Sequence, residues 1–536
     1  MHKLIVPILF FLISDVYGQL IYEPLNSGIY DYLDRMNIGG LIELDSEAKP
    51  FSRNYIAEKL QMIDSQSNKL NIVEREELDW YSREYKYELN RQDIPARIRL
   101  YEYSDSSFHL MVSPIGAYGK YYSGKYSSKL TRFGIHVAGS VSDWFGAVVH
   151  MNDTEQMGSN VDKDEYLTSN KGHPHVYAPD GIGYSEVSNQ INVSWNWGSI
   201  SLSKEYAEWG NAYFGNIILS DKAPSYPKIS ISIKPVDWLR INWQHGWIHS
   251  GIIDSSFSHI NPTNSENIVA FEKFIKKYFV ANIITVSPFR WMDISLGNSH
   301  IYAGDLRPEM FLPFGFYKYF DRETGKASQE DGNGSLFGDI AVRYPQNYKF
   351  YSSFYLEVAN LRKLLNNEPP YLTWFGYTVG VKRVNLIFNN LDFILEYTRM
   401  NPWVYEHRLE VTNYKHLDYS LGHWLGQNAD HLRVQADYQF IRGLKFKLYF
   451  ERVRKGGLLN VDDFAYNDNV DEPFLYGPLR KDFYIGLETQ YEIIHEFFIK
   501  GIYKYSDITD EDNLRTPDWM LGKNHHLSIE LFYGLR

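Results

Sequence analysis

The residues best suited to chemistry lie close together, between positions 206 and 231. Aromatic faces pack on the C–H faces of sugar rings, while amides, carboxylates and cations hydrogen-bond the sugar hydroxyls. This stretch offers that mixture, so it predicts a glycan-binding site. The alternative is that its rings pack the chain itself or lie in an interfacial aromatic belt. The predicted contacts are Trp209, Asn211, Tyr213, Lys222 and Tyr226, with Glu208 and Phe214 beside them.

Further polar and aromatic candidates lie later in the chain. Arg307 and Glu309 join the predicted glycan contacts. Trp403 and Trp424 supply two more aromatic surfaces. Acidic pairs such as Asp305 and Glu309 can in principle cleave a glycoside. A chain with 66 acidic residues contains many such pairs, so this spacing alone does not predict hydrolysis.

No enzyme motif is present in the sequence. The chain has no Gly-x-Ser-x-Gly elbow, no His-Glu-x-x-His pair and no phosphate-binding Gly-Lys-Ser/Thr loop. His245 and His249 share a strand face, and His173 and His175 flank a proline, but zinc normally requires a further ligand. Residues 331–334 resemble part of a calcium loop without its later acidic ligands. We therefore expect no catalytic residue, no metal site and no cofactor.

The local sequence predicts that residues 206–231 form an irregular loop held between strands. A strand-like run ends near Tyr206, and Gly210 and Gly215 interrupt the extended pattern. Pro224 and Pro227 then mark the return to an alternating run. The elements on both sides must therefore be strands that hold this loop in place.

From residue 95 onward the hydrophobic pattern has a period of two, as in β-strands. Charged and polar side chains alternate with apolar ones, which favours a membrane barrel with a polar lumen over a soluble sandwich. The alternative is a sandwich whose polar faces are its outer surface. A content of 16% aromatic and 22% charged residues suits such a barrel. The clearest runs are 132–137, 191–197, 229–233, 239–244, 444–451 and 527–533.

The length of this region sets the number of strands. A membrane strand with its connection takes about 25 residues, so residues 95–536 predict a mainly β, transmembrane antiparallel barrel of about 16–18 strands. Short turns at 142–143, 288–289 and 442–443 are expected on the periplasmic side. The longer polar segments, expected outside, lie near 152–181, 252–270, 320–335, 361–370, 413–430 and 455–480.

The first 94 residues differ from the rest. Residues 1–18 have the charged start, short apolar run and small-residue end of a secretory signal peptide. Residues 19–94 predict a small N-terminal helical segment in the periplasm. Its helices are expected to begin after Asn26 or Ser27, after Ser52 and after Asn71, the last with Glu74 completing a capping box.

Charge and cysteine content exclude several classes of protein. A formal net charge of −12 argues against nucleic acid as a partner, because binding phosphates requires a concentrated basic face. The absence of cysteine excludes disulfides, a lipoprotein anchor and thiolate metal sites. Local Lys and Arg patches can still hold an anionic glycan or a lipopolysaccharide phosphate.

Several blocks, in order along the chain, resemble the Wzi-type capsule assembly proteins. The stretch 206–231 resembles the family's internal signature, in which a Trp-Gly pair precedes a Leu-Ser step and two spaced prolines. Here these are Trp209-Gly210, Leu219-Ser220, Pro224 and Pro227. The other similar blocks are 32–35, 39–42, 49–53, 302–309, 312–314, 336–340, 351–357 and 425–430.

This resemblance implies a non-enzymatic outer-membrane β-barrel that acts as a lectin and holds capsular or surface polysaccharide at the cell surface. Its expected surroundings are outer-membrane lipid and lipopolysaccharide, and it is expected to be a monomer. The alternative function is an outer-membrane porin or sugar-uptake channel, whose lumen would be open.

Overall fold

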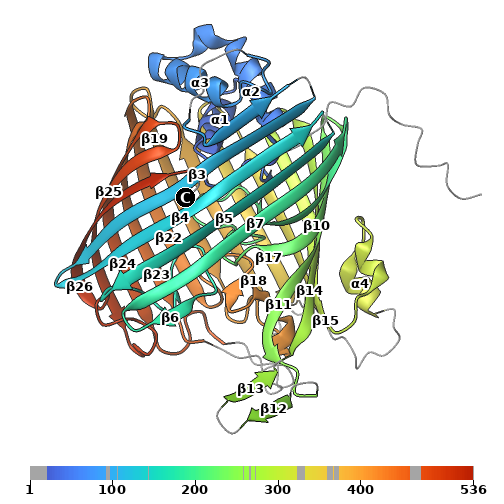
Figure 1. Ribbon diagram of the computed structural model, residues 1–536, viewed down its shortest axis with the longest axis vertical. Helices are drawn as coiled ribbons and strands as arrows, with labels where there is room; N and C mark the ends of the chain where they lie inside the picture. The colour runs from blue at the N-terminus through green and yellow to red at the C-terminus, as the bar shows by residue number, and fades with distance from the viewer. Residues whose placement is uncertain are drawn as a thin grey trace, which may run out of the picture.

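The computed structural model describes residues 21–91, 97–105, 107–142, 144–256, 259–264, 267–271, 273–322, 332–358, 366, 374–458 and 472–534. Eighteen strands form one closed antiparallel barrel (Figure 1), as predicted. Each pairs with the next along the chain, and β26 returns to pair with β3. The barrel strands are β3 (Phe108–Ser123), β4 (Tyr126–Val141), β5 (Phe145–Gly158), β7 (Gly181–Trp195), β8 (Gly198–Glu205), β10 (Tyr226–Val236), β11 (Leu239–Ile253), β14 (Phe274–Phe289), β15 (Met292–Ala303), β16 (Asn333–Val342), β17 (Tyr348–Val358), β18 (Trp374–Arg383), β19 (Leu391–Met400), β22 (Ala429–Ile441), β23 (Leu444–Lys455), β24 (Arg480–Ile494), β25 (Phe497–Asp510) and β26 (Gly522–Tyr533).

Shorter elements decorate the barrel. Two strands extend its rims, namely β2 (Tyr101–Ser104) on β3 and β6 (Val176–Ala178) on β7. The remaining short elements are β1 (Ala48–Lys49) with β9 (Glu208–Trp209), β12 (His259–Asn264) with β13 (Asn267–Phe271), β20 (Lys415–His416) with β21 (Tyr419–Ser420), the 3₁₀ turns η1 (Ser67–Lys69), η2 (Pro308–Phe311) and η3 (Glu410–Thr412), and α4 (Tyr317–Arg322).

The strand faces follow the predicted alternation. In β7, Ile191 is 48% exposed on the outer wall, whereas Asn192 is 0% and Ser194 is 3% exposed on the inner face. An apolar outer wall with polar inner residues is the pattern of a barrel that spans a membrane. Because the sheet closes on itself, the polar faces lie inside, which rules out the sandwich. The other predicted runs also lie within strands, except that Trp197 belongs to the turn after β7.

Three helices form a small bundle before the barrel: α1 (Ile29–Ile38), α2 (Arg53–Asp64) and α3 (Ile72–Glu84). The Ser52 side chain caps α2, and Asn71 with Glu74 forms the predicted capping box of α3. The predicted cap of α1 was wrong, because Gly28 holds this position without a side-chain bond. Among the described residues, no helix is long and apolar enough to cross a bilayer.

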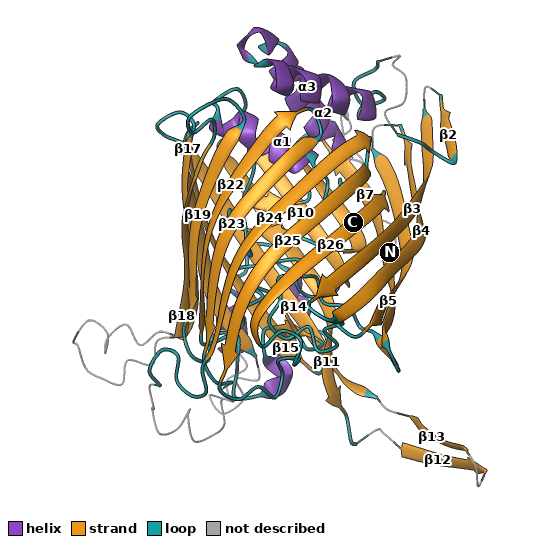
Figure 2. Ribbon diagram, turned by 90° about the vertical axis from the view of Figure 1, so that its left-hand side faces the viewer, coloured by secondary structure: helices purple, strands orange, loops and turns teal. Residues whose placement is uncertain are grey.

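The helical bundle lies against the end of the barrel that carries the short turns (Figure 2). The Glu77 carboxylate accepts a hydrogen bond from the backbone N–H of Gly443 at 3.1 Å, and Asn71 donates to Asn390 at 2.9 Å. The long connections and the β12–β13 hairpin lie at the opposite end (Figure 1). The predicted signal peptide, residues 1–18, and the predicted boundary at 94–95 both lie outside the described residues.

The lumen has two unlike halves, and the predicted polar lumen describes only one of them. In one half, which we call the packed half, apolar residues of β11 and β14–β19 point inward and pack against residues 206–226 and 401–428. These stretches bring buried side chains such as Ile217 and Val404 into the lumen, and such side chains require apolar partners. The hollow half, bounded by the inner faces of β22–β26 and β3–β7, keeps polar side chains around cavities.

Candidate functional site

The stretch predicted as the glycan site crosses the inside of the barrel. Gly210 and Gly215 have φ values of +120° and +135°, which L side chains rarely adopt. A Cβ on Gly215 would approach the His423 ring to 2.8 Å. The two glycines therefore let the chain turn inward after β8 and pass through a crowded interior. Trp209, in β9, pairs there with Ala48 of the helical segment.

Two of the predicted aromatic contacts lie in the packed half. Trp209 is 4% exposed, and its ring lies 6.4 Å from that of Phe337. Tyr226 is 5% exposed and makes an edge contact with Phe279. Trp403 is also buried, beside Trp374. In this structure these rings hold the inward stretches in place.

Asn211 and Tyr213 line a cavity of about 440 Å³ inside the barrel. The backbone N–H of Asn211 donates to Asp339 at 3.1 Å, and the Tyr213 hydroxyl donates to Asp34 at 2.6 Å. Asp34 is buried, which raises its pKa, but Lys349 and Lys382 outweigh burial and hold this pKa well below its usual range. We call this space the lysine cavity, after three lysines of the barrel strands that line it: Lys349, Lys445 and Lys447.

Lys222 lines the lysine cavity near the loop before β6. Its ammonium donates to the backbone carbonyl of Asn170 at 2.9 Å. Burial lowers the pKa of Lys222 to about 8, against the opposing effect of Glu165. Trp424 lines the same cavity, and its indole N–H donates to the carbonyl of Phe214 at 2.8 Å. Of the predicted set, Asn211, Tyr213 and Lys222 are therefore brought together around one space.

Arg307 and Glu309 lie elsewhere. They belong to the segment that leads through η2 to α4, which stands outside the barrel wall (Figure 1). The Arg307 guanidinium lies 5.6 Å from the centre of the Tyr302 ring, which packs with Tyr278, Met310 and Tyr317 in a cluster separate from the core of the packed half. The structure does not bring these two residues near the other predicted contacts.

A larger cavity, of about 640 Å³, lies in the hollow half. We call it the tyrosine cavity because four inward tyrosines and a tryptophan line it together with charged side chains. The aromatic lining residues include Tyr121, Tyr184, Tyr449, Tyr484 and Trp519, and the charged ones include Arg132, Glu186, Lys500, Lys504 and Glu530. This combination matches the chemistry that binds sugars.

Several contacts hold the tyrosine cavity open and ordered. Arg132 donates to Thr154 at 2.9 Å and to the hydroxyl of Tyr184 at 3.4 Å. The ring of His173, from the loop before β6, stacks on Tyr184 with 4.0 Å between centroids. Burial lowers the pKa of His173 to about 4, so this ring is neutral at pH 7. The loop thus covers the cavity with an uncharged ring.

The sequence interpretation missed the tyrosine cavity, because its lining comes from many strands. Signals within single strands were the polar inner faces of β23, with Tyr449, and of β26, with His526, Ser528 and Glu530, each alternating with apolar residues. Such a run identifies a polar inner face, but it does not say which other faces it meets across the lumen.

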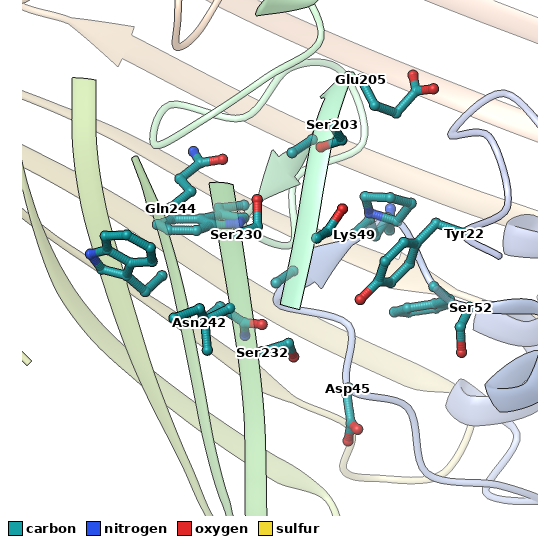
Figure 3. A pocket seen from close by; sticks show the side chains of 18 of the residues that line it. Tyr22, Asp45, Lys49, Ser52, Ser203, Glu205, Ser230, Ser232, Asn242 and Gln244 are labelled. Carbon is teal, nitrogen blue, oxygen red and sulfur yellow. The ribbon is translucent and has the colours of Figure 1, made fainter. Parts of the chain in front are cut away.

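A third, smaller pocket, of about 140 Å³, lies between the helical segment and the wall. Figure 3 shows Lys49 and Tyr22 of that segment facing Ser203 and Ser230 of the strands. The Tyr22 hydroxyl lies 2.8 Å from that of Ser199. This pocket is too small for a polysaccharide, which needs a larger cleft.

Residues 187–505, more than half of the chain, match the family described as "Capsule assembly protein Wzi". The chain belongs to the Wzi capsule assembly family. It is similar to the solved structure of Escherichia coli Wzi, described as a carbohydrate-binding β-barrel of the outer membrane involved in group 1 capsule assembly. The identity is 12%, over 97% of this chain and 100% of that chain, with a TM-score of 0.58, so this match supports the fold.

Other solved barrels share less of the structure. Acinetobacter baumannii OccAB1 matches with 8% identity over 82% of this chain and 99% of that chain, at a TM-score of 0.44. Pseudomonas aeruginosa OprD matches with 8% identity over 82% and 97%, at a TM-score of 0.39. No curated protein matches the chain.

Metal chemistry finds no support in the part of the chain that the structure describes. No group of three or more His, Cys, Asp or Glu side chains is arranged there to hold an ion. His245 stacks on Phe311 at 4.3 Å between centroids. Asp331, the first residue of the calcium-like run, lies outside the described residues.

Proposed function

We propose that this Wzi-family barrel lies in the outer membrane and binds surface polysaccharide, which it retains at the cell during capsule assembly. The observation that carries the proposal is the tyrosine cavity, where aromatic faces and charged groups line one space inside a membrane barrel. The proposed role is binding without catalysis, as membership of this family supports. The ligand is bound and released unchanged.

The packed half of the lumen favours retention over diffusion. Residues 206–226 and 401–428 fill much of the interior, and the helical bundle lies across the end with the short turns. A porin or sugar-uptake channel requires a continuous aqueous path. The second candidate function, a channel, therefore has less support than a binding barrel.

The arrangement of the two ends supports a proposed orientation. The helical segment lies with the short turns, which in outer-membrane barrels face the periplasm, and the long loops then face outside. This orientation places lipid and lipopolysaccharide around the apolar wall of a single barrel. Asn211, Tyr213 and Lys222 become proposed contacts for a glycan that reaches the lysine cavity.

A binding measurement with the full chain tests the function. The purified barrel in detergent is titrated with the polysaccharide of its own strain, beside the double variant Tyr449→Ala/Tyr484→Ala. Losing two aromatic contacts should weaken binding at least about tenfold, because removing an aromatic anchor commonly costs about 2 kcal/mol.

The matched control carries the same change on the outer wall, as Tyr491→Ala/Tyr503→Ala. Both of these side chains are exposed there, so we expect wild-type affinity. If the cavity variant binds as tightly as the control, the tyrosine cavity is not the site. If the wild-type barrel binds no polysaccharide and instead conducts ions in planar bilayers, the channel is the better description.

A further inference from the structure

One side of the outer wall, formed by β19 and β22–β26 (Figure 2), carries charged side chains near the long connections. Arg399 of β19 stands opposite Asp430 of β22. Asp430 stands opposite Arg454 of β23, and Arg454 stands opposite Lys481 of β24. Residues directly opposite in an antiparallel sheet share a face, so these four side chains form one row.

A second row runs beside the first, one step further from the ends of the strands. Arg452 of β23 stands opposite Phe483 of β24, and Phe483 stands opposite Asp507 of β25. Asp507 in turn stands opposite Lys523 of β26. We call the five cations of the two rows the basic rim: Arg399, Arg452, Arg454, Lys481 and Lys523.

The basic rim borders the part of the wall that faces lipid. Further along the same strands the outward side chains are apolar and between 44% and 56% exposed: Leu448, Ile485, Leu487 and Leu527. In the proposed orientation the long connections face outside, so the rim lies at the level of the headgroups of the outer leaflet. A lipid on this side of the barrel therefore has an apolar surface for its chains and a cationic surface for its headgroup.

Cations outnumber carboxylates in these two rows. The rows contain five cations and two carboxylates, Asp430 and Asp507. Asp430 accepts a hydrogen bond from Arg454 at 2.9 Å, and Glu511, one step further out, accepts from the backbone N–H of Leu479 at 2.9 Å. The other carboxylates of these strands alternate with the rim and face the lumen: Asp392, Glu396, Asp437, Glu451, Asp482, Glu488, Glu492, Asp510 and Glu530. This part of the outer wall therefore attracts anions.

Arg452 stands between apolar residues in the sheet. Its neighbours in register are Leu432 and Phe483, and it forms no salt bridge with the residues that the structure describes. Its Nε is buried and lacks a hydrogen-bond partner among the same residues. A buried donor without a partner costs free energy, so an anion that binds here supplies a missing acceptor.

A phenylalanine orders the other end of the rim. Phe474 belongs to the connection before β24, and the centre of its ring lies 3.9 Å from the Arg399 guanidinium and 6.0 Å from that of Arg454. Cation–π contacts of this kind fix guanidinium groups in place. Side chains that are already ordered lose less entropy when they bind a ligand.

We propose that the basic rim binds the phosphorylated headgroup of lipopolysaccharide, whose acyl chains lie on the apolar rows of the same strands. Arg452 and Lys481 are diagonal neighbours in the sheet, so their long side chains reach one phosphate. The guanidinium and the ammonium form charge-assisted hydrogen bonds with it, which weaken with added salt. The site rests on the proposed location and orientation in the outer membrane, and it lies outside the lumen in which polysaccharide is proposed to bind.

The test uses lipid A that carries two phosphates and the same lipid after its phosphates are removed. Each is titrated into the full-length barrel in detergent, and native mass spectrometry measures the bound fraction. The wild type should bind the phosphorylated lipid at least about tenfold more tightly, because losing hydrogen bonds between charged groups weakens binding by about that factor or more. Arg452→Gln/Lys481→Gln should bind the phosphorylated lipid at least about tenfold more weakly than the wild type, and its affinity for the other lipid should change less than about twofold.

Two further variants separate charge at the rim from charge in general. Lys69→Gln/Arg75→Gln removes one exposed lysine and one exposed arginine from the helical segment and should bind both lipids like the wild type. Arg452→Lys/Lys481→Arg keeps both charges and should recover most of the affinity. Retention of the folded form in unheated gel electrophoresis shows that each variant has a closed barrel. If Arg452→Gln/Lys481→Gln does not fold, the comparison of the two lipids on the wild type decides.

Three results overturn the lipid site. They are equal affinity of the wild type for the two lipids, equal affinity of Arg452→Gln/Lys481→Gln and the wild type for the phosphorylated lipid, and a loss of the same size in Lys69→Gln/Arg75→Gln. Titration of the same variants with the polysaccharide of the strain separates this site from the proposed function, and the affinity should equal that of the wild type in each folded variant. If the wild type binds phosphorylated lipid A but no polysaccharide, the lipid site stands and polysaccharide binding fails. The reverse result removes the lipid site alone.

Discussion

The packed and hollow halves of the lumen are lined by strands of the same barrel, yet they differ in how charged side chains are paired and in how much of the space is filled. Around Phe337 and Trp209 the interior is apolar and filled, and nearby cations are paired. Around Tyr449 the interior is polar, and Lys447 forms no salt bridge with the residues that the structure describes. One side of the barrel interior thus stabilises the fold, while the other side leaves space for a ligand. This difference in filling indicates where the protein binds.

The largest expected effect comes from emptying the packed half. Phe337→Ala removes a ring that is 1% exposed and packs on Trp209. Such a truncation should lower the free energy of unfolding by about 3–5 kcal/mol. Tyr449→Ala, in the hollow half, should cost about 1 kcal/mol. Urea unfolding in detergent, followed by gel mobility, measures both; similar losses would mean that the halves are not mechanically distinct.

The pairing of charge gives the next sharpest contrast. Asp34→Asn leaves Lys349 and Lys382, which are 2% and 5% exposed, without their carboxylate. We expect a loss of about 3 kcal/mol, because a buried charge loses its partner. The control Asp64→Asn, at the end of α2, removes an exposed carboxylate that forms no salt bridge with the described residues, and should change stability little. Equal effects would refute the proposed difference in charge pairing.

Acid should loosen the helical segment from the barrel, with a smaller effect. Burial raises the pKa of Glu84, but Arg97, Arg99 and His495 outweigh it and hold this pKa well below the ordinary 4.5. Stability from Glu84 is therefore present above pH 4.5 and is lost as the pH falls below that value. Burial also lowers the pKa of His495 from 6.5 to about 3. Below pH 6.5 the unfolded chain binds a proton on this ring and the folded protein does not, so the folded state loses stability as the pH falls.

One neighbour opposes this trend over part of the range. Burial raises the pKa of Glu496 from 4.5 to about 7, so the folded state gains stability as the pH falls from 7 to 4.5. We expect a shallow dependence from pH 7 to 5 and a steep loss below pH 4.5. Urea titrations at pH 7, 5 and 3.5, followed by the fluorescence of Trp80 beside His495, measure it. In Glu84→Gln the loss of stability below pH 4.5 should be smaller. If that loss is unchanged in the variant, groups other than Glu84 cause it.

Much of the architecture could be predicted from the sequence. Strand faces follow from alternation at i and i+2, as Ile191 and Asn192 show, and helix starts follow from caps such as Ser52 and Asn71. The number of strands follows from length. These features depend on contacts within a few residues or on simple spacing, so a short stretch of sequence is enough to predict them.

The contents of the lumen depended on tertiary structure. The same stretch, 206–231, reads as an exposed loop or as a folded-in one, and only the inward apolar faces of β14–β17 give Trp209 a place to pack. Likewise, Tyr184 of β7 and Tyr484 of β24 line one cavity because the pairing of β26 with β3 closes the barrel and brings these distant strands around it. The sequence by itself determined the wall and its helices, through local periodicity. Tertiary structure decided which half is filled and which can bind, because burial is settled by partners far apart in the chain.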